Sequence, residues 1–470
     1  MIHARATVVR ITLLASRLSP LALTLLAAPL GAQSLAARAD SIFGRWAGDG
    51  APGCAIAVDH GDSAVYRGAF GLAELEYAIP NTDTTIFEAG SVSKQFTAAS
   101  VLLLAARGVL SLDDPIQQWF PEIPVYAAPI TIRHLMLHTS GLRDWGSVMS
   151  LAGWGRWTAT YTQDDALAII ARQRGLNHVT GAEFSYTNSG YNLLAILVER
   201  AAKQSFQDFM TREFFAPLGM RHTSWRADYT RVVPGRAQAY ARAGGAWHLD
   251  MPFEDVVGNG GLLTTVQDLL TWTHALHAGR LGRPDVSTAM LTSGTFNDGR
   301  PVNYGGGLFL GPLRGVPSIN HGGSTAGYRT LLAAFPAQHV MAAILCNRGD
   351  ANATRLMIDL LQPLVPFAAA TPSVPAPVAA PFRLDPGRLT DYTGRFRSEE
   401  VPATLDIRVT RGQLTVSRKP GDSAVLRPQA VDEFTGLGGT FQFVRDDAGR
   451  ITRLIVTIPR VVGMPFERID

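Results

Sequence analysis

The chain has 470 residues, of which 46% are hydrophobic and 17% are charged, and its formal net charge is +3. This composition is typical of globular proteins and excludes a disordered or fibrous chain. The length allows two or three domains with a large core, and the small net charge gives no indication of nucleic-acid binding.

The first 32 residues predict an export signal. They contain three arginines and no acid, then the apolar run Leu21–Ala28, and they end at a plausible cleavage site, Pro29–Ala32. The run is short for a bilayer span, although an uncleaved anchor remains an alternative. Cleavage after residue 32 removes the three arginines and brings the net charge to zero. We expect an exported protein, periplasmic or secreted, without a stable membrane span after cleavage.

Residues 33–365 predict one domain. Residues 35–48 resemble a short amphipathic helix, and Ala55–Val58 with Ala64–Phe70 predict a β-hairpin. Helical patterns occupy much of the middle, and strand-like runs return near the end. These later predicted strands are Tyr304–Leu310, Ser318–His321, Tyr328–Phe335 and Val340–Cys346, and Ala353–Leu364 follows as a helix. Strands at both ends of a helical middle predict one sheet built from both ends of the domain.

The two cysteines, Cys54 and Cys346, each lie in a strand-like apolar run. Small buried core residues explain both positions, and we favour this interpretation. A disulfide is possible if the chain is exported and the two strands are neighbours.

A candidate nucleophile lies where strand-like sequence gives way to helix. Val92–Arg107 predicts an apolar helix closed by Gly108, so Ser91 lies at a helix N-terminus, where free N–H groups favour an oxygen that gains negative charge. Lys94 follows three residues later on the same face. A lysine whose pKa is lowered by burial can activate a serine, whereas arginine cannot. The chain has only three lysines, so Lys94 is suggestive here, although chance can produce Ser-x-x-Lys.

A second candidate stretch is Glu183–Tyr191, a polar turn before a helix. Tyr186 can relay a proton, and Asn188 can hold a substrate carbonyl or a neutral lysine amine. Ordinary turn chemistry also explains this composition.

A third stretch, Asn320–Ser324, ends a predicted strand. Gly323 and the glycine before it let a substrate backbone lie close, and the Ser324 N–H can join that of Ser91 in an oxyanion hole. A glycine turn with an incidental histidine, His321, is the alternative for this stretch alone.

His134 and His138 are spaced like metal ligands on a helix. The zinc-protease pattern requires a glutamate after the first histidine, where this chain has Leu135, and a third ligand is missing. We therefore expect neither a metal nor another cofactor, and we expect both histidines to brace a buried turn.

A Pro/Ala-rich linker, residues 366–383, precedes a different kind of sequence. Residues 384–470 alternate apolar and polar positions in short runs such as Ala403–Thr410, separated by glycine turns. They predict a small all-β module, barrel-like or a curled sheet.

In this order, Ser91-x-x-Lys94, Tyr186-x-Asn188 and His321-x-Gly323 resemble the motifs of the serine β-lactamase and penicillin-binding protein superfamily. The similarity is to the branch with class C β-lactamases, D-alanyl-D-alanine carboxypeptidases, D-aminopeptidases and related esterases. It covers roughly residues 38–365. The resemblance implies an α/β (α+β) fold in which helices and a helical subdomain flank an antiparallel sheet. It also implies an acyl-enzyme at Ser91, with Lys94 as general base and Tyr186 sharing the proton transfer.

One motif departs from the class C pattern. Those enzymes carry Lys-Thr-Gly where this chain has His321-Gly322-Gly323, which is more similar to the D-aminopeptidases and some esterases. A histidine with its ordinary pKa of about 6.5 is largely uncharged at neutral pH. If His321 is the main residue that contacts the position of a substrate carboxylate, we expect the enzyme to prefer esters and amides without a carboxylate. Arg329 is the alternative source of a charge.

We therefore expect an exported serine hydrolase that acts on D-amino-acid peptides, amides or small esters. A classical β-lactamase is the alternative within the same superfamily. A non-hydrolytic protein that recognises penicillin and binds wall peptides is the alternative of a different class. The expected partner is a small-molecule or short-peptide substrate, and the oligomeric state is left open.

Overall fold

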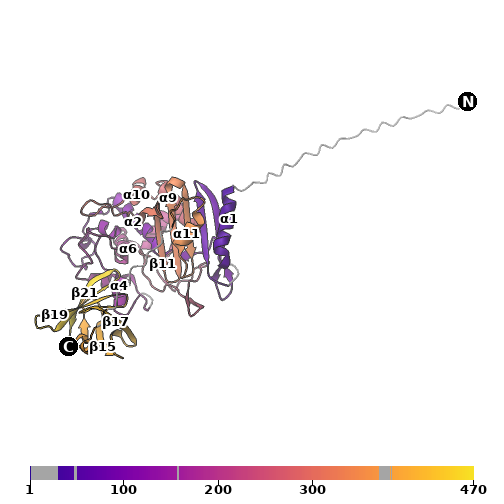
Figure 1. Ribbon diagram of the computed structural model, residues 1–470. Coiled ribbons are helices and arrows are strands. Elements are labelled where there is room, and N and C mark those ends of the chain that lie inside the picture. The colour runs from indigo at the N-terminus through magenta and orange to yellow at the C-terminus, as the bar shows by residue number, and fades with distance from the viewer. Residues whose placement is uncertain (2–29, 47–49, 156–157, 370–381, 383) are drawn as a thin grey trace.

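The computed structural model describes residues 1, 30–46, 50–155, 158–369, 382 and 384–470. Its larger part contains an antiparallel sheet with helices on both faces, and a C-terminal closed β-barrel lies against this part near helix α4 (Trp145–Leu151) (Figure 1). This arrangement confirms the predicted fold class. The predicted signal, residues 1–32, lies almost entirely outside the described residues. Within the described ranges, no helix has the length and apolarity needed to cross a bilayer.

The central sheet has six antiparallel strands in the order β10-β11-β12-β13-β1-β2. Strands from both ends of the domain therefore lie side by side, as the sequence predicts. The strands are β1 (Cys54–His60), β2 (Ser63–Phe70), β10 (Phe309–Leu313), β11 (Val316–Thr325), β12 (Tyr328–Phe335) and β13 (Val340–Cys346).

Both faces of this sheet are covered, which explains the continuous apolar sequence of β1. Ala55 and Ala57 face one core cluster, and Cys54, Ile56 and Val58 face the other. Helices α1 (Leu30–Phe43) and α11 (Ala353–Leu361) cover the face of the second cluster, and α9 (Val266–His277) lies on the opposite face (Figure 1).

The remaining helices form the helical subdomain on the α9 side of the sheet. They are α2 (Lys94–Ala106), α3 (Ile132–Met136), α4, α5 (Gln163–Ala171), α6 (Asn188–Ala202), α7 (Phe206–Met210), α8 (Ala216–Leu218) and α10 (Pro284–Met290). Helix α2 packs against α6 and α10, and α6 also packs against α3 and α5.

Short strands complete this part of the molecule. They are β3 (Leu72–Glu74) with β4 (Ile79–Pro80), β7 (Tyr240–Ala243) with β8 (Ala246–Leu249), and the sheet of β5 (Phe87–Glu88), β9 (Leu262–Thr264) and β6 (Ser224–Trp225). Strand β5 leads directly into the turn that carries the candidate nucleophile.

The prediction of unpaired cysteines is wrong. Cys54 and Cys346 are opposite each other in the β1–β13 pair and form a disulfide. Both side chains are fully buried, as expected. The sequence alone could not show that the first and the last predicted strands of this domain, β1 and β13, pair directly with each other.

The C-terminal module is a closed barrel of eight antiparallel strands. They are β14 (Gly394–Arg397), β15 (Thr404–Thr410), β16 (Gln413–Lys419), β17 (Asp422–Ala430), β18 (Glu433–Gly436), β19 (Gly439–Arg445), β20 (Ile451–Ile458) and β21 (Val461–Arg468). Buried aromatic rings, among them Phe396, Phe434 and Phe443, pack edge to face and fill its core. Most of the predicted linker, 366–383, lies outside the described residues, so the boundaries 33–365 and 384–470 stay predictions.

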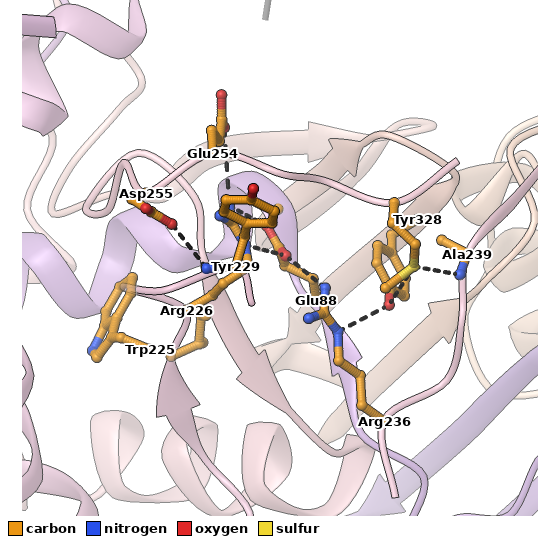
Figure 2. Close-up of polar contacts among 12 residues, drawn as sticks. Glu88, Trp225, Arg226, Tyr229, Arg236, Ala239, Glu254, Asp255 and Tyr328 are labelled. Atoms are coloured by element: carbon orange, nitrogen blue, oxygen red, sulfur yellow. Dashed lines mark hydrogen bonds and ion pairs between the residues drawn. The ribbon is translucent and has the colours of Figure 1, made fainter. Parts of the chain in front are cut away.

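A buried ion-pair network surrounds Glu88, three residues before the candidate nucleophile (Figure 2). The carboxylate of Glu88, in β5, accepts hydrogen bonds of 2.9 and 3.2 Å from Arg226. Arg236 lies 3.4 Å from the same carboxylate, and its Nε is 3.3 Å from the Tyr328 hydroxyl of β12. Glu254 lies 4.0 Å from Arg226. Two acids and two arginines thus balance their charge in the core and connect β5 to β12.

Replacing Glu88 with Gln should lower the free energy of unfolding by about 3–5 kcal/mol, because it leaves two buried arginines with half of their anionic partners. Chemical denaturation followed by tryptophan fluorescence measures this loss. Glu76→Gln, at an exposed position, is the matched control and should change stability by less than about 0.5 kcal/mol. A loss below about 1 kcal/mol for Glu88→Gln would mean that the network does not stabilise the fold.

Candidate active site

Ser91 lies in a short 3₁₀ turn, Gly90–Ser93, that continues directly into helix α2. The helix therefore begins two residues later than the predicted Val92. Gly90 adopts φ +54°, and a Cβ there would lie 2.8 Å from the backbone nitrogen of Ser324. Glycine at this position allows the turn to approach strand β11 closely. Ser91 is held at the start of α2, at the open edge of the central sheet.

Lys94 is the first residue of α2, and its side chain is fully buried. Its Nζ lies 3.1 Å from Ser91 Oγ, 3.0 Å from Asn188 Oδ1 and 2.7 Å from the backbone oxygen of Asn259. The amine thus joins the two predicted site residues Ser91 and Asn188. Asn259 lies outside the three motifs, and no local sequence pattern predicts that its backbone oxygen meets the amine.

Asn188 begins helix α6, and the carboxylate of Asp144 fixes its position. The Asn188 N–H donates to Asp144 Oδ2 at 2.7 Å, and the Ser147 N–H donates to Asp144 Oδ1 at 3.0 Å. Asp144 therefore caps α4 and orients α6 with one buried side chain. Sequence reasoning did not identify Asp144, because an N-capping aspartate is common in any helical protein.

The Tyr186 ring lies beside Lys94, whose Nζ is 4.9 Å from the ring centroid. The Tyr186 hydroxyl is buried close to Ser91 but forms no regular hydrogen bond with any described residue. Burial raises the pKa of Tyr186 above its ordinary value of 10, and interaction with Ser91 opposes this rise. Tyr186 therefore stays protonated at neutral pH and has a proton available for donation.

His321, in β11, is buried and neutral. Its Nδ1 lies 2.6 Å from the backbone oxygen of Gly322, so Nδ1 carries the proton, and Nε2 accepts a hydrogen bond from the Tyr304 hydroxyl at 3.2 Å. Burial and then the proximity of Lys94 lower the pKa of His321 to about 3. His321 is therefore uncharged at neutral pH, as expected, and burial keeps it uncharged well below its ordinary pKa of 6.5.

The glycines of the third motif allow β11 to lie against the nucleophile turn. A Cβ on Gly323 would lie 2.1 Å from the Ala89 backbone oxygen and 2.1 Å from Thr330 Oγ1. Thr330 Oγ1 donates a hydrogen bond of 2.9 Å to that same Ala89 oxygen. Ser324 is consequently adjacent to Gly90, so the backbone N–H groups of Ser91 and Ser324 border the same space.

These residues line one cavity of about 810 Å³. All the predicted residues meet there: Ser91, Tyr186, Asn188, His321, Gly323 and Ser324 lie in its wall, with Lys94 beneath Ser91. Arg329 also lines it, and its Nη1 donates to the backbone oxygens of Ala326 and Tyr328. Arg460, from the barrel, is a further lining residue that no local sequence signal identified.

His134 and His138 both have structural contacts. His134 Nδ1 completes the capping box at the start of α3 with Thr131. His138 is fully buried under the Tyr186 ring, at 4.2 Å between centroids, and burial followed by nearby Lys94 lowers its pKa well below 6.5. Among the residues that the structure describes, no cluster of side chains could hold a metal ion.

Comparison with known sequences agrees with this geometry. The Beta-lactamase family model matches residues 39–363. Penicillin-binding protein 4* of Bacillus subtilis (strain 168) is 29% identical over 320 residues, which cover 63% of this chain and 68% of that protein. A D-aminopeptidase of Gluconobacter oxydans (strain 621H) is 26% identical over 306 residues, which cover 64% of this chain and 56% of the enzyme. This chain spans little more than half the length of the D-aminopeptidases that it matches.

Solved structures share the fold. The crystal structure of SurE has a TM-score of 0.60 at 22% identity and covers 93% of this chain and 99% of its own. An octameric penicillin-binding protein homologue from Pyrococcus abyssi has a TM-score of 0.59 at 21% identity and covers 92% and 97%. A D-amino acid amidase from Ochrobactrum anthropi SV3 has a TM-score of 0.58 at 21% identity and covers 70% and 98%. The family match and these structures confirm the resemblance expected from the three motifs.

The low pKa of His321 predicts a pH dependence of stability. The unfolded histidine binds a proton near pH 6.5 and the folded one does not until about pH 3, so protonation favours the unfolded chain as the pH falls below 6.5. Between pH 7 and pH 5 the wild type should lose about 2 kcal/mol more stability than His321→Asn. Denaturation at both pH values measures this difference.

His222→Asn, at an exposed histidine, is the matched control and should keep the wild-type pH dependence. Equal losses in the wild type and His321→Asn would show that His321 titrates near its ordinary pKa in the folded protein.

Proposed function

The chain belongs to the Beta-lactamase family and is a β-lactamase-related hydrolase, and on this premise we propose that it forms an acyl-enzyme at Ser91. Its proposed substrates are D-amino-acid peptides, D-amino-acid amides or small esters. Water then releases the acyl group from Ser91. Lys94 serves as the general base and Tyr186 as the general acid.

The observation that carries this proposal is the buried Lys94 amine at 3.1 Å from Ser91 Oγ. A neutral amine has two N–H donors and one lone pair. In that state it donates to Asn188 Oδ1 and to the Asn259 backbone oxygen, and its lone pair accepts the Ser91 hydroxyl proton. This arrangement matches that of a serine with an adjacent base.

The proposed roles of the other site residues follow from where charge and protons move as the acyl-enzyme forms. As Ser91 Oγ bonds to the substrate carbonyl carbon, its proton moves to Lys94 and the carbonyl oxygen becomes an oxyanion. We assign the stabilisation of this charge to the backbone N–H groups of Ser91 and Ser324. Tyr186, kept protonated by burial, donates its proton to the leaving group and recovers one from Lys94.

The substrate class is supported by the names of relatives and by His321. Several relatives are named D-aminopeptidase, and a structural neighbour is a D-amino acid amidase. A neutral histidine stands where class C β-lactamases place a lysine charge, which argues against a classical β-lactamase. A pure binding protein has no use for a serine next to a buried amine, which argues against the non-hydrolytic alternative.

We also propose that the protein is exported, through the signal in residues 1–32. The Cys54–Cys346 disulfide supports this assignment, because such bonds persist in oxidising compartments. N-terminal sequencing of the mature protein tests it, and retention of residues 1–32 on a protein in the reducing cytoplasm would contradict it.

The experiment that tests the proposed function is intact-mass analysis after incubation with a fluorophosphonate, a β-lactam and a D-amino-acid amide. Ser91 should form the fluorophosphonate adduct, and the amide should be hydrolysed faster than the β-lactam. Ser91→Ala should remove the adduct and lower kcat by roughly 10³-fold or more while the protein stays folded. Near-wild-type turnover by Ser91→Ala would rule out Ser91 as the nucleophile.

Replacing Lys94 with Arg should lower kcat as much as replacing it with Ala, because arginine keeps its proton at the pH of the assay and cannot act as a base. Steady-state kinetics with one D-amino-acid amide compares both variants. Lys203→Arg, at an exposed lysine, is the control and should keep wild-type activity. Activity retained only by Lys94→Arg would show that the positive charge of Lys94 matters and its basicity does not.

A further inference from the structure

The barrel contributes a residue to the active site. Arg460 lies in the two-residue turn between β20 and β21, and it lines the same cavity as Ser91, Tyr186 and His321. Its backbone adopts φ +68°, in the left-handed region. Its guanidinium carbon lies 5.2 Å from the centroid of the Tyr186 ring, which is within the range of a cation–π contact.

Backbone hydrogen bonds hold this turn against the larger domain. The backbone oxygen of Arg460 accepts hydrogen bonds from the Asp144 N–H at 3.2 Å and from Asn177 Nδ2 at 3.0 Å. The Val462 N–H donates to Asn177 Oδ1 at 2.8 Å. These hydrogen bonds use the main chain of Arg460, whose guanidinium contacts the Tyr186 ring and lies 3.8 Å from Asp144.

A buried ion pair anchors the barrel near this turn. Arg143 Nη1 lies 2.6 Å from Glu400 Oε2, both side chains are less than one-tenth exposed, and the Arg174 N–H donates to the same oxygen. Arg143 Nη2 also donates to the backbone oxygen of Val462, at 3.2 Å. The position of the Arg460 turn over the active site is therefore fixed by the barrel interface.

The Arg460 guanidinium keeps its hydrogen-bond donors available. Within the described part of the chain it donates no hydrogen bond, and 44% of the side chain is exposed. Its nearest acid is Asp144, at 3.8 Å, and that carboxylate already accepts the backbone N–H groups of Asn188 and Ser147. Of the other cationic groups near the cavity, Lys94 is buried against Ser91, and Arg329 donates from Nη1 to two backbone oxygens.

We propose that Arg460 binds a carboxylate on the leaving-group side of the substrate, so that the barrel sets a preference for anionic leaving groups such as a free C-terminal D-amino acid. This inference rests on the proposed function. Tyr186 is the proposed proton donor to the leaving group, and Arg460 lies against the Tyr186 ring. A carboxylate one or two bonds beyond the scissile atom meets the guanidinium in a charge-assisted pair.

This assignment differs from the two sources of substrate charge recognition that the sequence suggested. His321 is neutral, and the alternative, Arg329, uses its Nη1 in hydrogen bonds to the backbone oxygens of Ala326 and Tyr328. In the proposal the cation comes from the barrel, at a residue 139 positions after His321 and 131 positions after Arg329.

The test compares two thioesters with the same acyl group, N-acetyl-D-alanyl thioglycolate and N-acetyl-D-alanyl thioglycolamide. Their leaving groups differ only by a carboxylate. In Arg460→Gln, the ratio of kcat/KM for the charged over the neutral thioester should fall by roughly 10- to 100-fold, the range for one charge-assisted hydrogen bond. Arg460→Lys should restore part of the ratio. Added salt should lower it in the wild type, because the side chain is partly exposed.

Arg411→Gln is the matched control. Arg411 is exposed in the turn between β15 and β16 and also has a positive φ, of +51°, so the substitution is chemically equivalent but distant from the cavity. It should leave the ratio unchanged. If Arg460→Gln lowers kcat/KM for both thioesters by the same factor, or leaves the ratio unchanged, Arg460 does not bind the carboxylate and the proposal is overturned.

A binding measurement separates this proposal from the proposed function. Calorimetric titration of Ser91→Ala with the two thioesters reports recognition without turnover. Tighter binding of the thioglycolate by Ser91→Ala that disappears in Ser91→Ala/Arg460→Gln supports Arg460 even if no acyl adduct forms at Ser91 in the wild type and the nucleophile assignment fails. Equal binding of both thioesters by Ser91→Ala overturns the role of Arg460, whatever the catalytic result.

Discussion

The burial of one lysine amine is the constraint on which the site depends. Lys94 Nζ is surrounded by Ser91 Oγ, Asn188 Oδ1 and the Asn259 backbone oxygen, which come from three separate segments. A buried amine without such partners is costly, so the turn before α2, the start of α6 and the 258–261 loop must all be in place together. The hydrogen bonds that satisfy the Lys94 amine also hold it beside Ser91 Oγ and Asn188.

Close packing of the nucleophile turn against strands β11 and β12 fixes the position of Ser91 relative to the central sheet. Gly90 and Gly323 allow the nucleophile turn to touch β11, and Thr330 bonds the Ala89 oxygen from β12. Beneath this contact, the Glu88 network joins β5 to β12 in the core. The nucleophile is therefore attached to the rigid sheet, with no long loop between them, which favours a preorganised geometry.

The sequence predicted well those features that depend on residues close together in the chain. Ser91 and Lys94 are three residues apart at a helix start, so their contact follows from helix geometry. The apolar run of β1 and the alternation of β15 likewise predict a buried strand and a barrel strand. No local pattern shows that Tyr186, Asn188 and His321, which lie far apart in the chain, meet at one site. Their meeting and the fold class were predicted only from the resemblance of the ordered motifs to a known family.

The remaining features depend on tertiary burial and docking. The charge state of His321 follows from its enclosure, which a sequence does not display. The disulfide required knowledge that β1 and β13 are neighbours. Arg460 is one arginine among many in a chain where arginine is the common basic residue, and its position depends on the Arg143–Glu400 interface. Such contacts have no signature in the spacing of nearby residues.

The pairing of β1 with β13 also has a consequence for the order in which the molecule is completed during synthesis. The two cysteines are 292 positions apart, so a chain made from its N-terminus presents the β1–β2 hairpin long before β13 exists. Until then one edge of β1 has unpaired backbone groups, and Cys54 is a free thiol. For most of its elongation the nascent chain therefore exposes an unpaired strand edge and a free thiol, and with only two cysteines a wrong disulfide could form only with another molecule.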